Sequence, residues 1–291
     1  RKIMTRIDSL LGDRVTVSCE VFPPREFARC EEAKQVVREI AALKPLFISV
    51  TYGAAGLTPQ FTRDIAQVVQ QNGVPALAHL TCINSTVDTV DSALDELEAA
   101  GVENVLALRG DIPQDGDPLS DRHFEHAAQL VAHIKRRGGF CIGAACYPEG
   151  HPEAENRDAD MRYLKQKADA GVDFLTTQMF FDNATLYNFL YRALREGIDL
   201  PVSAGIMPVI KAKQIKRIAS LSGASLPPRF LSIVDRFGSD PASMRQAGVA
   251  YATEQIIDLI ANGIRHIHLY TMNRADVAAD VFRNLGAIIG R

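Results

Sequence analysis

The chain has 291 residues, of which 47% are hydrophobic and 23% charged, the composition of a globular protein that can bury a sizeable core. Its formal net charge of -3, with acidic and basic residues interspersed, argues against nucleic-acid or polyanion binding. No apolar run approaches the roughly 20 residues that cross a bilayer, and the first residues lack the apolar segment of a signal peptide. The five cysteines contain no CxxC pair, so we expect reduced thiols in a cytoplasmic protein.

Strand-like and helix-like segments alternate along the chain. We expect strands at residues 14–20, 46–51, 74–80, 104–108, 140–146, 172–177, 201–206 and 265–270. Helices are expected at 31–43, 59–72, 85–100, 121–137, 154–170, 183–196, 211–220 and 227–237, in a longer segment ending at 262, and at 274–285. Ser85 and Asp88 have the spacing of a capping box, and a glycine followed by an apolar residue, as at Gly101-Val102, ends several helices.

The regular alternation of strands and helices implies parallel strands joined by crossover helices. Eight strands, with no linker and no change of composition between them, predict one closed (β/α)8 TIM barrel that forms a single catalytic domain over residues 1–291. Extra helices are predicted between the seventh and eighth strands. An open doubly wound sheet is the alternative fold.

The clearest predicted strand end is Asn104-Val-Leu-Ala-Leu-Arg-Gly-Asp111, an apolar run that stops at a charged pair beside a glycine. In a parallel barrel the carboxyl ends of all strands open on one face, where active sites lie. The polar residues that the strands deliver to this face are Glu20, Thr51, His79, Arg109, Asp111, Tyr147, His151, Gln178, Thr271, Asn273 and Arg274. Two carboxylates, several hydrogen-bond donors and a cationic rim would suit a polar heteroaromatic ligand in a cleft.

The two carboxylates have competing interpretations. Glu20 either caps a loop and pairs with Arg25, or acts as a general acid beside the apolar segment Val21-Phe22-Pro23-Pro24. Asp111 either pairs with Arg109 or faces the donor edge of a ligand. The residues alone leave both alternatives open.

Signatures of several other enzyme classes are missing from the sequence. It holds no GxGxxG after a strand, no P-loop, no GxSxG and no HExxH. His266 and His268 point to the same side of the last strand, as two metal ligands would, but with no third ligand nearby we expect no metal. Asp160 and Lys167 lie seven residues apart on one predicted helix, so both can face one side, either toward a ligand or toward solvent.

Several short motifs stand at the predicted strand ends: Cys19-Glu-Val-Phe-Pro-Pro-Arg25, Ser49-Val-Thr-Tyr-Gly53, Ala78-His-Leu-Thr-Cys82, Leu106-Ala-Leu-Arg-Gly-Asp111, Tyr147-Pro-Glu-Gly-His-Pro-Glu153, Lys167-Ala-Asp-Ala-Gly171, Thr177-Gln-Met-Phe-Phe-Asp182, Gly205-Ile-Met-Pro208 and Tyr270-Thr-Met-Asn-Arg274. Together and in this order they resemble the methylenetetrahydrofolate reductase family. The similarity covers nearly the whole chain. It is a similarity to the bacterial-type catalytic barrel alone, without the regulatory extension of the eukaryotic enzymes.

The resemblance implies a flavoprotein oxidoreductase of one-carbon metabolism and methionine biosynthesis. It would use FAD and NAD(P)H to reduce 5,10-methylenetetrahydrofolate to 5-methyltetrahydrofolate by a ping-pong mechanism, in which the nicotinamide nucleotide reduces the flavin and leaves before folate binds. A nucleotide that only visits the pocket above the flavin would account for the missing dinucleotide fingerprint. We expect a homo-oligomer with no nucleic-acid or membrane partner.

The resemblance also assigns roles to residues at matching positions. Glu20 would protonate the bridging nitrogen of the folate and open its five-membered ring, and Asp111 would hold the amino edge of the pterin and tune the flavin. Gln178 and Arg274 would bind substrate, the latter at its acidic tail. The positions that match FAD contacts are Thr51, Tyr52, His79, Leu108, Arg109, Gly110, Asp111, Tyr147, His151, Asp160 and Lys167.

Two positions depart from the family pattern. His126 stands where many members have a flavin-contacting tyrosine, and Ile218 where bacterial members have an aromatic residue that packs on nicotinamide or folate. Loss of that ring would remove a stacking contact worth ~0.5–1.5 kcal/mol. Two other functions are alternatives: a barrel lyase or aldolase, which would need a Schiff-base lysine or a metal, and a non-catalytic or partner-dependent subunit that binds folate or flavin for another reductase.

Overall fold

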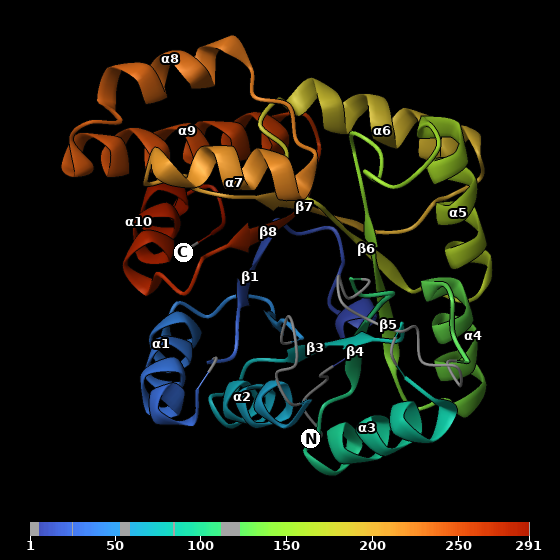
Figure 1. Ribbon diagram of the computed structural model, residues 1–291. Coiled ribbons are helices and arrows are strands. Elements are labelled where there is room, and N and C mark those ends of the chain that lie inside the picture. Colours follow the sequence, from blue (N-terminus) through green and yellow to red (C-terminus); the bar gives the residue numbers. More distant parts are fainter. Residues whose placement is uncertain (1–5, 25, 53–58, 84, 112–122, 291) are drawn as a thin grey trace.

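Eight parallel strands close into a barrel in the order in which they occur in the chain (Figure 1). The structure is a computed structural model that describes residues 6–24, 26–52, 59–83, 85–111 and 123–290; Arg25, the glycine-rich turn at 53–56 and the predicted helix start at Asp121 lie outside them. The strands are β1 (Thr16–Val21), β2 (Ile48–Val50), β3 (Ala76–Thr81), β4 (Asn104–Leu108), β5 (Cys141–Cys146), β6 (Phe174–Thr177), β7 (Val202–Ile206) and β8 (His266–Tyr270). Because β8 pairs with β1, the predicted (β/α)8 barrel is confirmed and the open sheet is excluded.

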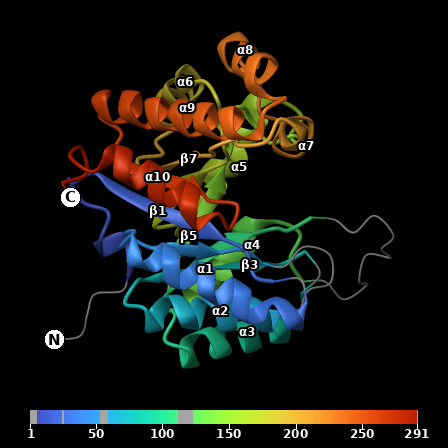
Figure 2. The same ribbon diagram turned by 90° about the vertical axis from the view of Figure 1, so that its left-hand side faces the viewer.

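Helices surround the barrel, and three of them form a separate group between β7 and β8. The helices are α1 (Cys30–Ala42), α2 (Pro59–Gln71), α3 (Val87–Ala99), α4 (Ala127–Arg137), α5 (Arg157–Asp169), α6 (Asn183–Arg195), α7 (Lys213–Ser222), α8 (Pro228–Phe237), α9 (Pro241–Ala261) and α10 (Ala275–Leu285), with short 3-10 turns η1 (Ile7–Ser9) and η2 (Phe27–Arg29). Figure 2 shows α7, α8 and α9, the predicted extra helices, at one end of the molecule. None of the described helices is long and apolar enough to cross a membrane.

Apolar side chains fill the space between the strands and the helices, and also the interior of the barrel at the amino ends of the strands. Helices of the barrel turn an apolar stripe toward the strands, as α3 does with Val90, Leu94 and Leu97. The amino ends of the strands are closed from inside by Ile7, Phe47, Leu77, Leu106, Cys141 and Phe174. The carboxyl end of the barrel is therefore the end that remains for polar groups. All five cysteines are free thiols, as expected.

Among the helices that begin at a side-chain cap, α3, α4 and α5 start at points that differ from the predicted ones. The hydroxyl of Thr86, and not that of Ser85, caps α3 by accepting the N–H of the third helical residue at 3.2 Å. The side-chain carbonyl of Gln129 accepts the N–H of the residue before α4 at 3.0 Å. Asn156 accepts two N–H groups of the first turn of α5 at 3.1 and 2.9 Å. Both α4 and α5 therefore begin a few residues later than predicted.

One asparagine joins the loops that follow the first and last strands. Asn273 accepts the backbone N–H of Phe22 at 2.9 Å and donates to the carbonyl of the same residue at 2.9 Å. The turn that presents it places Met272 and Asn273 in the left-handed region, with φ of 52° and 54°. Next to it, the hydroxyl of Thr271 donates to the carbonyl of Glu20 at 2.6 Å. These contacts fix the carboxyl end of β1 against that of β8.

Candidate active site

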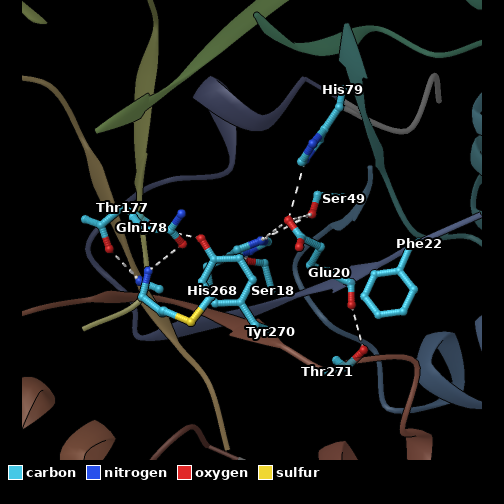
Figure 3. A network of polar contacts seen from close by, with 12 residues as sticks. Ser18, Glu20, Phe22, Ser49, His79, Thr177, Gln178, His268, Tyr270 and Thr271 are labelled. Carbon is cyan, nitrogen blue, oxygen red and sulfur yellow. Dashed lines mark hydrogen bonds and ion pairs between the residues drawn. The ribbon is translucent and has the colours of Figure 1, made fainter. Parts of the chain in front are cut away.

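Glu20 lies at the carboxyl end of the barrel among polar side chains from three other strands (Figure 3). Its Oε2 atom is 3.3 Å from the hydroxyl of Ser49 on β2, 3.6 Å from Nε2 of His79 on β3 and 3.8 Å from Nε2 of His268 on β8. The Glu20 side chain keeps 16% of its surface exposed, whereas His268 keeps 1%. The carboxyl group is thus enclosed on its inner side and can still be reached from the mouth.

Burial keeps the His79 imidazole uncharged at neutral pH. Loss of hydration inside the barrel lowers its pKa from 6.5 to about 4; the nearby Glu20 opposes this shift and His268 adds to it. Within the described part of the chain, Nε2 of His79 has no hydrogen-bond partner. A neutral imidazole at 3.6 Å from a carboxyl oxygen can form a hydrogen bond after a small movement, but it does not neutralise the carboxylate.

Tyr270 connects Glu20 with the neighbouring strand ends. Its hydroxyl donates to the carbonyl of Thr177 on β6 at 2.6 Å (Figure 3). Burial raises the pKa of Tyr270 well above its usual value, and the ionisable groups of Glu20 and Tyr147 raise it further, so both lie within electrostatic range of the phenol. Gln178 directly follows β6, and its side-chain carbonyl accepts the N–H of the next residue at 3.0 Å.

A cavity of about 250 Å³ opens between the ends of β4 and β5 and the helices α4 and α5. Six of the residues predicted to contact FAD line it: Leu108, Arg109, Tyr147, His151, Asp160 and Lys167. The rest of the lining includes the small residues Ala107 and Ala145, and the first turn of α4. The cavity therefore combines apolar walls, two cationic side chains and a helix N-terminus.

Burial shifts the titration of the charged groups in this cavity. It lowers the pKa of Lys167, whose ammonium donates to the carbonyl of Ala145 at 2.6 Å. It raises the pKa of Asp160, and Lys167 partly opposes that shift. The pKa of Tyr147 is raised to about 12, mainly by burial and further by Asp160. The ring of His151 lies edge-on against the ring of Tyr147, with the two centroids 4.5 Å apart. The helical spacing of Asp160 and Lys167 does bring both to one cavity.

Arg109 lines the cavity, and Asp111 follows it two residues later. The guanidinium of Arg109 pairs with Glu153 at 2.6 Å. Asp111 is exposed, and its charge contributes to the raised pKa of Tyr147. In the closed parallel barrel the carboxyl ends of β1, β4, β5, β6 and β8 all open on one side, which we call the mouth.

Three predicted residues contact neighbouring protein groups and do not line the cavity. The backbone carbonyl of Thr51 accepts the hydroxyl of Thr62 at 3.0 Å. Tyr52 packs against the main apolar core, where burial raises its pKa. The guanidinium of Arg274 donates to Asp276 at 2.8 and 2.7 Å. A ligand carboxylate that binds Arg274 would have to compete with Asp276.

Part of the polar group around Glu20 is not among the predicted site residues. Ser49, His268 and Tyr270 surround the acid (Figure 3). His268 and Tyr270 stand two positions apart on β8, as Ser18 and Glu20 do on β1, and residues two apart on a strand share one face. Polar residues repeated at this spacing in apolar barrel strands are the signal that would have indicated an inward polar cluster.

The two departures from the family pattern have different surroundings. The ring of His126 stacks on Tyr163 of α5, with centroids 6.5 Å apart and planes inclined by 16°, and both residues line the cavity. Tyr163 therefore supplies an aromatic ring beside the position where the family pattern has one. Ile218 lies on α7, 8% exposed, in an apolar cluster with Phe181 and Met207.

A second cavity, of about 370 Å³, lies between the start of α6 and the helices α8 and α9. Its charged groups already have protein partners. Arg229 pairs with Glu254, and Asp258 accepts the hydroxyl of Tyr187 at 2.9 Å. Asp182 caps α6. None of the residues that line it belongs to the mouth, so we do not assign the chemistry to it.

Three potential metal ligands meet at the opposite end of the barrel. Ligand atoms of Asp8, Cys141 and Asp173 lie within 4.8 Å of one another. Asp8 pairs with Arg6 at 3.0 Å, and Asp173 pairs with Lys135 at 3.2 Å. Burial raises the pKa of the Cys141 thiol to about 12. Because a metal needs deprotonated ligands, this cluster of paired carboxylates and a neutral thiol is a poor metal site.

Comparison with known proteins identifies the family of the chain. A family profile described as methylenetetrahydrofolate reductase matches residues 4–286. The chain belongs to this family. It is 34% identical over 277 residues to "5,10-methylenetetrahydrofolate reductase" of Pectobacterium carotovorum, which covers 95% of this chain and 92% of that protein. It is also 34% identical over 302 residues to "Methylenetetrahydrofolate reductase (NADH) 1" of Zea mays, where it spans 99% of this chain but 51% of the plant protein.

Solved structures of low identity share the barrel. An uncharacterized protein from Clostridium thermocellum, described as binding two copies of 5-methyl-5,6,7,8-tetrahydrofolic acid, has a TM-score of 0.68 at 13% identity and covers 98% of this chain and 99% of that chain. Dihydropteroate synthase from Xanthomonas albilineans, solved with 7,8-dihydropteroate, has a TM-score of 0.52 at 15% identity and covers 96% of this chain and 94% of that chain. At these identities the likeness shows the fold alone.

Proposed function

We propose that this member of the methylenetetrahydrofolate reductase family uses FAD and NAD(P)H to reduce 5,10-methylenetetrahydrofolate to 5-methyltetrahydrofolate. The observation that carries the proposal is the position of Glu20, a partly exposed acid on the same mouth as the cavity beside Arg109. The names of the bacterial relatives support it. In this proposal residues 1–291 act as one catalytic domain of a cytoplasmic homo-oligomer.

The side chains of the cavity fit a flavin dinucleotide. Arg109 and Lys167 supply positive charge, and the first turn of α4 lines the same space. A helix N-terminus favours a phosphate through its N–H groups and its dipole. The stacked rings of His126 and Tyr163 offer a flat apolar surface for a heteroaromatic ring. When bound, FAD would carry a hydride from the nicotinamide to the folate.

Glu20 is the general acid of the proposed reaction. Its O–H bond breaks, an N–H bond forms at the bridging nitrogen of the folate, and the ring C–N bond then breaks with its electron pair remaining on that nitrogen. The opened folate carries an electrophilic iminium carbon. Ser49, at 3.3 Å from Oε2, and Thr271, which binds the backbone carbonyl of Glu20, hold the acid in place during this step.

Asp111, Gln178 and Arg274 are the proposed folate contacts. Asp111 is exposed at the rim, where a carboxylate can accept hydrogen bonds from the amino edge of the pterin. Gln178 follows β6 beside Tyr270 (Figure 3). Arg274, at the start of α10, binds the acidic tail of the folate in exchange for part of its contact with Asp276.

The test separates the two half-reactions of the purified protein loaded with FAD. Stopped-flow absorbance measures flavin bleaching by NAD(P)H and, separately, flavin recovery with methylenetetrahydrofolate. We expect Glu20→Gln to leave bleaching unchanged and to slow recovery by ~10²–10⁴, the contribution typical of a general acid. The matched control is Glu32→Gln on the exposed surface of α1, for which both rates should equal those of the wild type.

Three other results would contradict the proposal, and each would point to a different conclusion. Equal losses in both half-reactions of Glu20→Gln would remove the acid role. Bleaching without any folate turnover in the wild type would favour a partner-dependent subunit. A protein that shows no flavin absorbance bands after incubation with FAD would favour the barrel lyase.

A further inference from the structure

Glu20 is the outer member of a line of polar side chains that runs into the barrel (Figure 3). Oε2 of Glu20 lies 3.3 Å from Oγ of Ser49, which lies 3.2 Å from Nε2 of His268. Nδ1 of His268 lies 2.7 Å from Oγ of Ser18, and Ser18 donates to the carbonyl of Ile267 at 3.1 Å. We call Glu20, Ser49, His268 and Ser18 the Glu20 relay.

The carbonyl at the inner end of the relay fixes the direction of its hydrogen bonds. A carbonyl can only accept, so the one hydroxyl proton of Ser18 is used on Ile267, and the Ser18 oxygen accepts from Nδ1–H of His268. A neutral His268 is then the Nδ1–H tautomer, and its Nε2 is an acceptor that faces Ser49.

Ser49 cannot serve both of its neighbours with one proton. If the carboxyl group of Glu20 is ionised, Ser49 donates to it and leaves the acceptor Nε2 of His268 without a donor. If the carboxyl group carries a proton, it donates to Ser49, and Ser49 donates to His268. Because a buried acceptor without a hydrogen-bond donor is destabilising, the relay favours the protonated acid.

The same proton could instead sit on His268 as an imidazolium. That ring is 1% exposed, stacks on Phe47 at 5.6 Å, and lies near the uncharged His79. A charge there would lose its hydration. The arrangement with a carboxylic acid and a neutral imidazole completes the same hydrogen bonds without burying a charge.

We propose that Ser49 and His268 are positioning residues that store the catalytic proton on Glu20 between turnovers. The inference rests on the proposed function, in which Glu20 is the general acid. The terminal torsion of a glutamate has a broad profile, so a half-turn of the carboxyl group carries the O–H from Ser49 to the mouth when folate binds. After the proton has moved to the folate nitrogen, the carboxylate accepts the Ser49 hydroxyl, and a proton from solvent restores the relay.

The first measurement needs neither folate nor NAD(P)H. In the full chain labelled with ¹⁵N-histidine, His268 should show the Nδ1–H tautomer at neutral pH, assigned from the signals that His268→Gln removes. Infrared difference spectra between the wild type and each variant should reveal a protonated carboxyl band. Glu20→Gln should remove this band, and Ser49→Ala should shift it. The control is His266→Gln: His266 stands on the same face of β8 but lies 2.9 Å from the hydroxyl of Thr16, so the band should not move.

The second measurement is the pH profile of the folate half-reaction. Among the residues that the structure describes, the ionisable groups that face Glu20 are His79 from β3, and His268 and Tyr270 from β8. We expect Ser49→Ala and His268→Gln to move the basic limb of the profile to lower pH and to slow this step about tenfold at neutral pH, with flavin bleaching by NAD(P)H unchanged. Ser49→Thr, which keeps the hydroxyl, should restore the wild-type profile.

These results separate the relay from the proposed function. An Nε2–H tautomer of His268, or an infrared band that Ser49→Ala does not move, overturns the relay even if Glu20 proves to be the acid. A normal folate step in Glu20→Gln overturns the acid role even if the tautomer is the expected one. Should Ser49→Ala fail to fold, Ser18→Ala takes its place. That variant removes the contact between Ser18 and Nδ1 of His268, and the same results are expected for it.

Discussion

The two halves of the barrel mouth are built in opposite ways. Around Glu20 the polar side chains come from the strands themselves, and Ser49 and His268 are almost completely buried and bonded to one another. Around the cavity the charged groups come from α5 and from the loops after β4 and β5. Lys167 donates to a backbone carbonyl, and Arg109 pairs with the exposed Glu153.

This difference separates two tasks. Groups fixed on strands and bonded to one another hold a proton in a defined place, which an acid requires. Arg109, on a loop and paired with the exposed Glu153, can exchange that partner for a ligand. In the proposed function, the proton chemistry therefore belongs to side chains on the strands, and ligand binding to side chains on α5 and the loops. The following experiments test that division, from the largest expected effect to the smallest.

The largest effect concerns His79 and acid stability. Its pKa is about 4 in the folded chain and 6.5 as the reference value for an unfolded one. The unfolded chain therefore binds more protons between these values, and stability is lost as the pH falls from about 6.5 to about 4. The shift corresponds to at most about 3 kcal/mol. Denaturant unfolding at several pH values in this range should show that the unfolding free energy of His79→Gln depends less on pH than that of the wild type.

The control for His79 is an exposed histidine of the same protein. His123→Gln should leave the pH dependence of the unfolding free energy unchanged, because that ring is exposed in the folded chain. If both variants keep the wild-type slope, the buried imidazole is not the group that couples stability to pH in this range.

Gly205→Ala perturbs the Glu20 half through Tyr270, whose ring lies 5.3 Å from that of His268. A Cβ atom at this position would lie 2.4 Å from the carbonyl of Thr177 and 2.6 Å from the ring of Tyr270. We expect a loss of about 1–3 kcal/mol in the unfolding free energy, as for other overpacked cores. Urea unfolding measures it. Gly12→Ala, where the added atom meets nothing within 4 Å, should be nearly neutral, and equal losses would contradict the steric account.

Lys167→Met examines the binding half. Removing the ammonium from the cavity should weaken FAD binding about tenfold, since a hydrogen bond to a charged group is worth about 1.5–3 kcal/mol. Flavin fluorescence titration gives the dissociation constant. Lys165→Met is the matched control, because that lysine stands on the same helix but pairs with Asp169 at the surface. A similar loss in both variants would show that the cavity is not the flavin site.

Arg274→Ala should have the smallest effect. Its guanidinium is shared with Asp276 and is partly exposed, so its loss should raise KM for methylenetetrahydrofolate about two- to fivefold and leave kcat unchanged. Steady-state kinetics at saturating NAD(P)H measure both constants. Arg283→Ala, on the exposed side of the same helix, should change neither. A fall in kcat without a change in KM would show that Arg274 does not bind the folate tail.

The sequence predicts the fold well because each strand and helix of the barrel has a local pattern of apolar and polar residues. The strand at Asn104–Leu108 coincides with its prediction, since an apolar run stops at a charged pair. Local competition is harder to predict: Thr86 and Ser85 are both capable of capping α3, and only the path of the chain decides between them.

The polar interior of the site was not predictable in the same way. His268 and Ser49 are 219 residues apart, and they meet because β8 and β2 flank β1 in a particular register. No single strand contains that information. The pairing of Arg109 with Glu153 depends likewise on a loop that folds back over the cavity. Candidate site residues such as Glu20 could be named from motifs, whereas the side chains that surround Glu20 required the three-dimensional arrangement.

The bond between Asn273 and Phe22 has a consequence for biosynthesis, because it joins positions 251 residues apart. During synthesis, one edge of β1 stays unpaired until β8 has left the ribosome. An unpaired strand edge can form hydrogen bonds with the wrong strand. The same late strand brings His268 and Thr271 to Glu20. A chain that ends before β8 therefore lacks both the closed barrel and the contacts of His268 and Thr271 with Glu20.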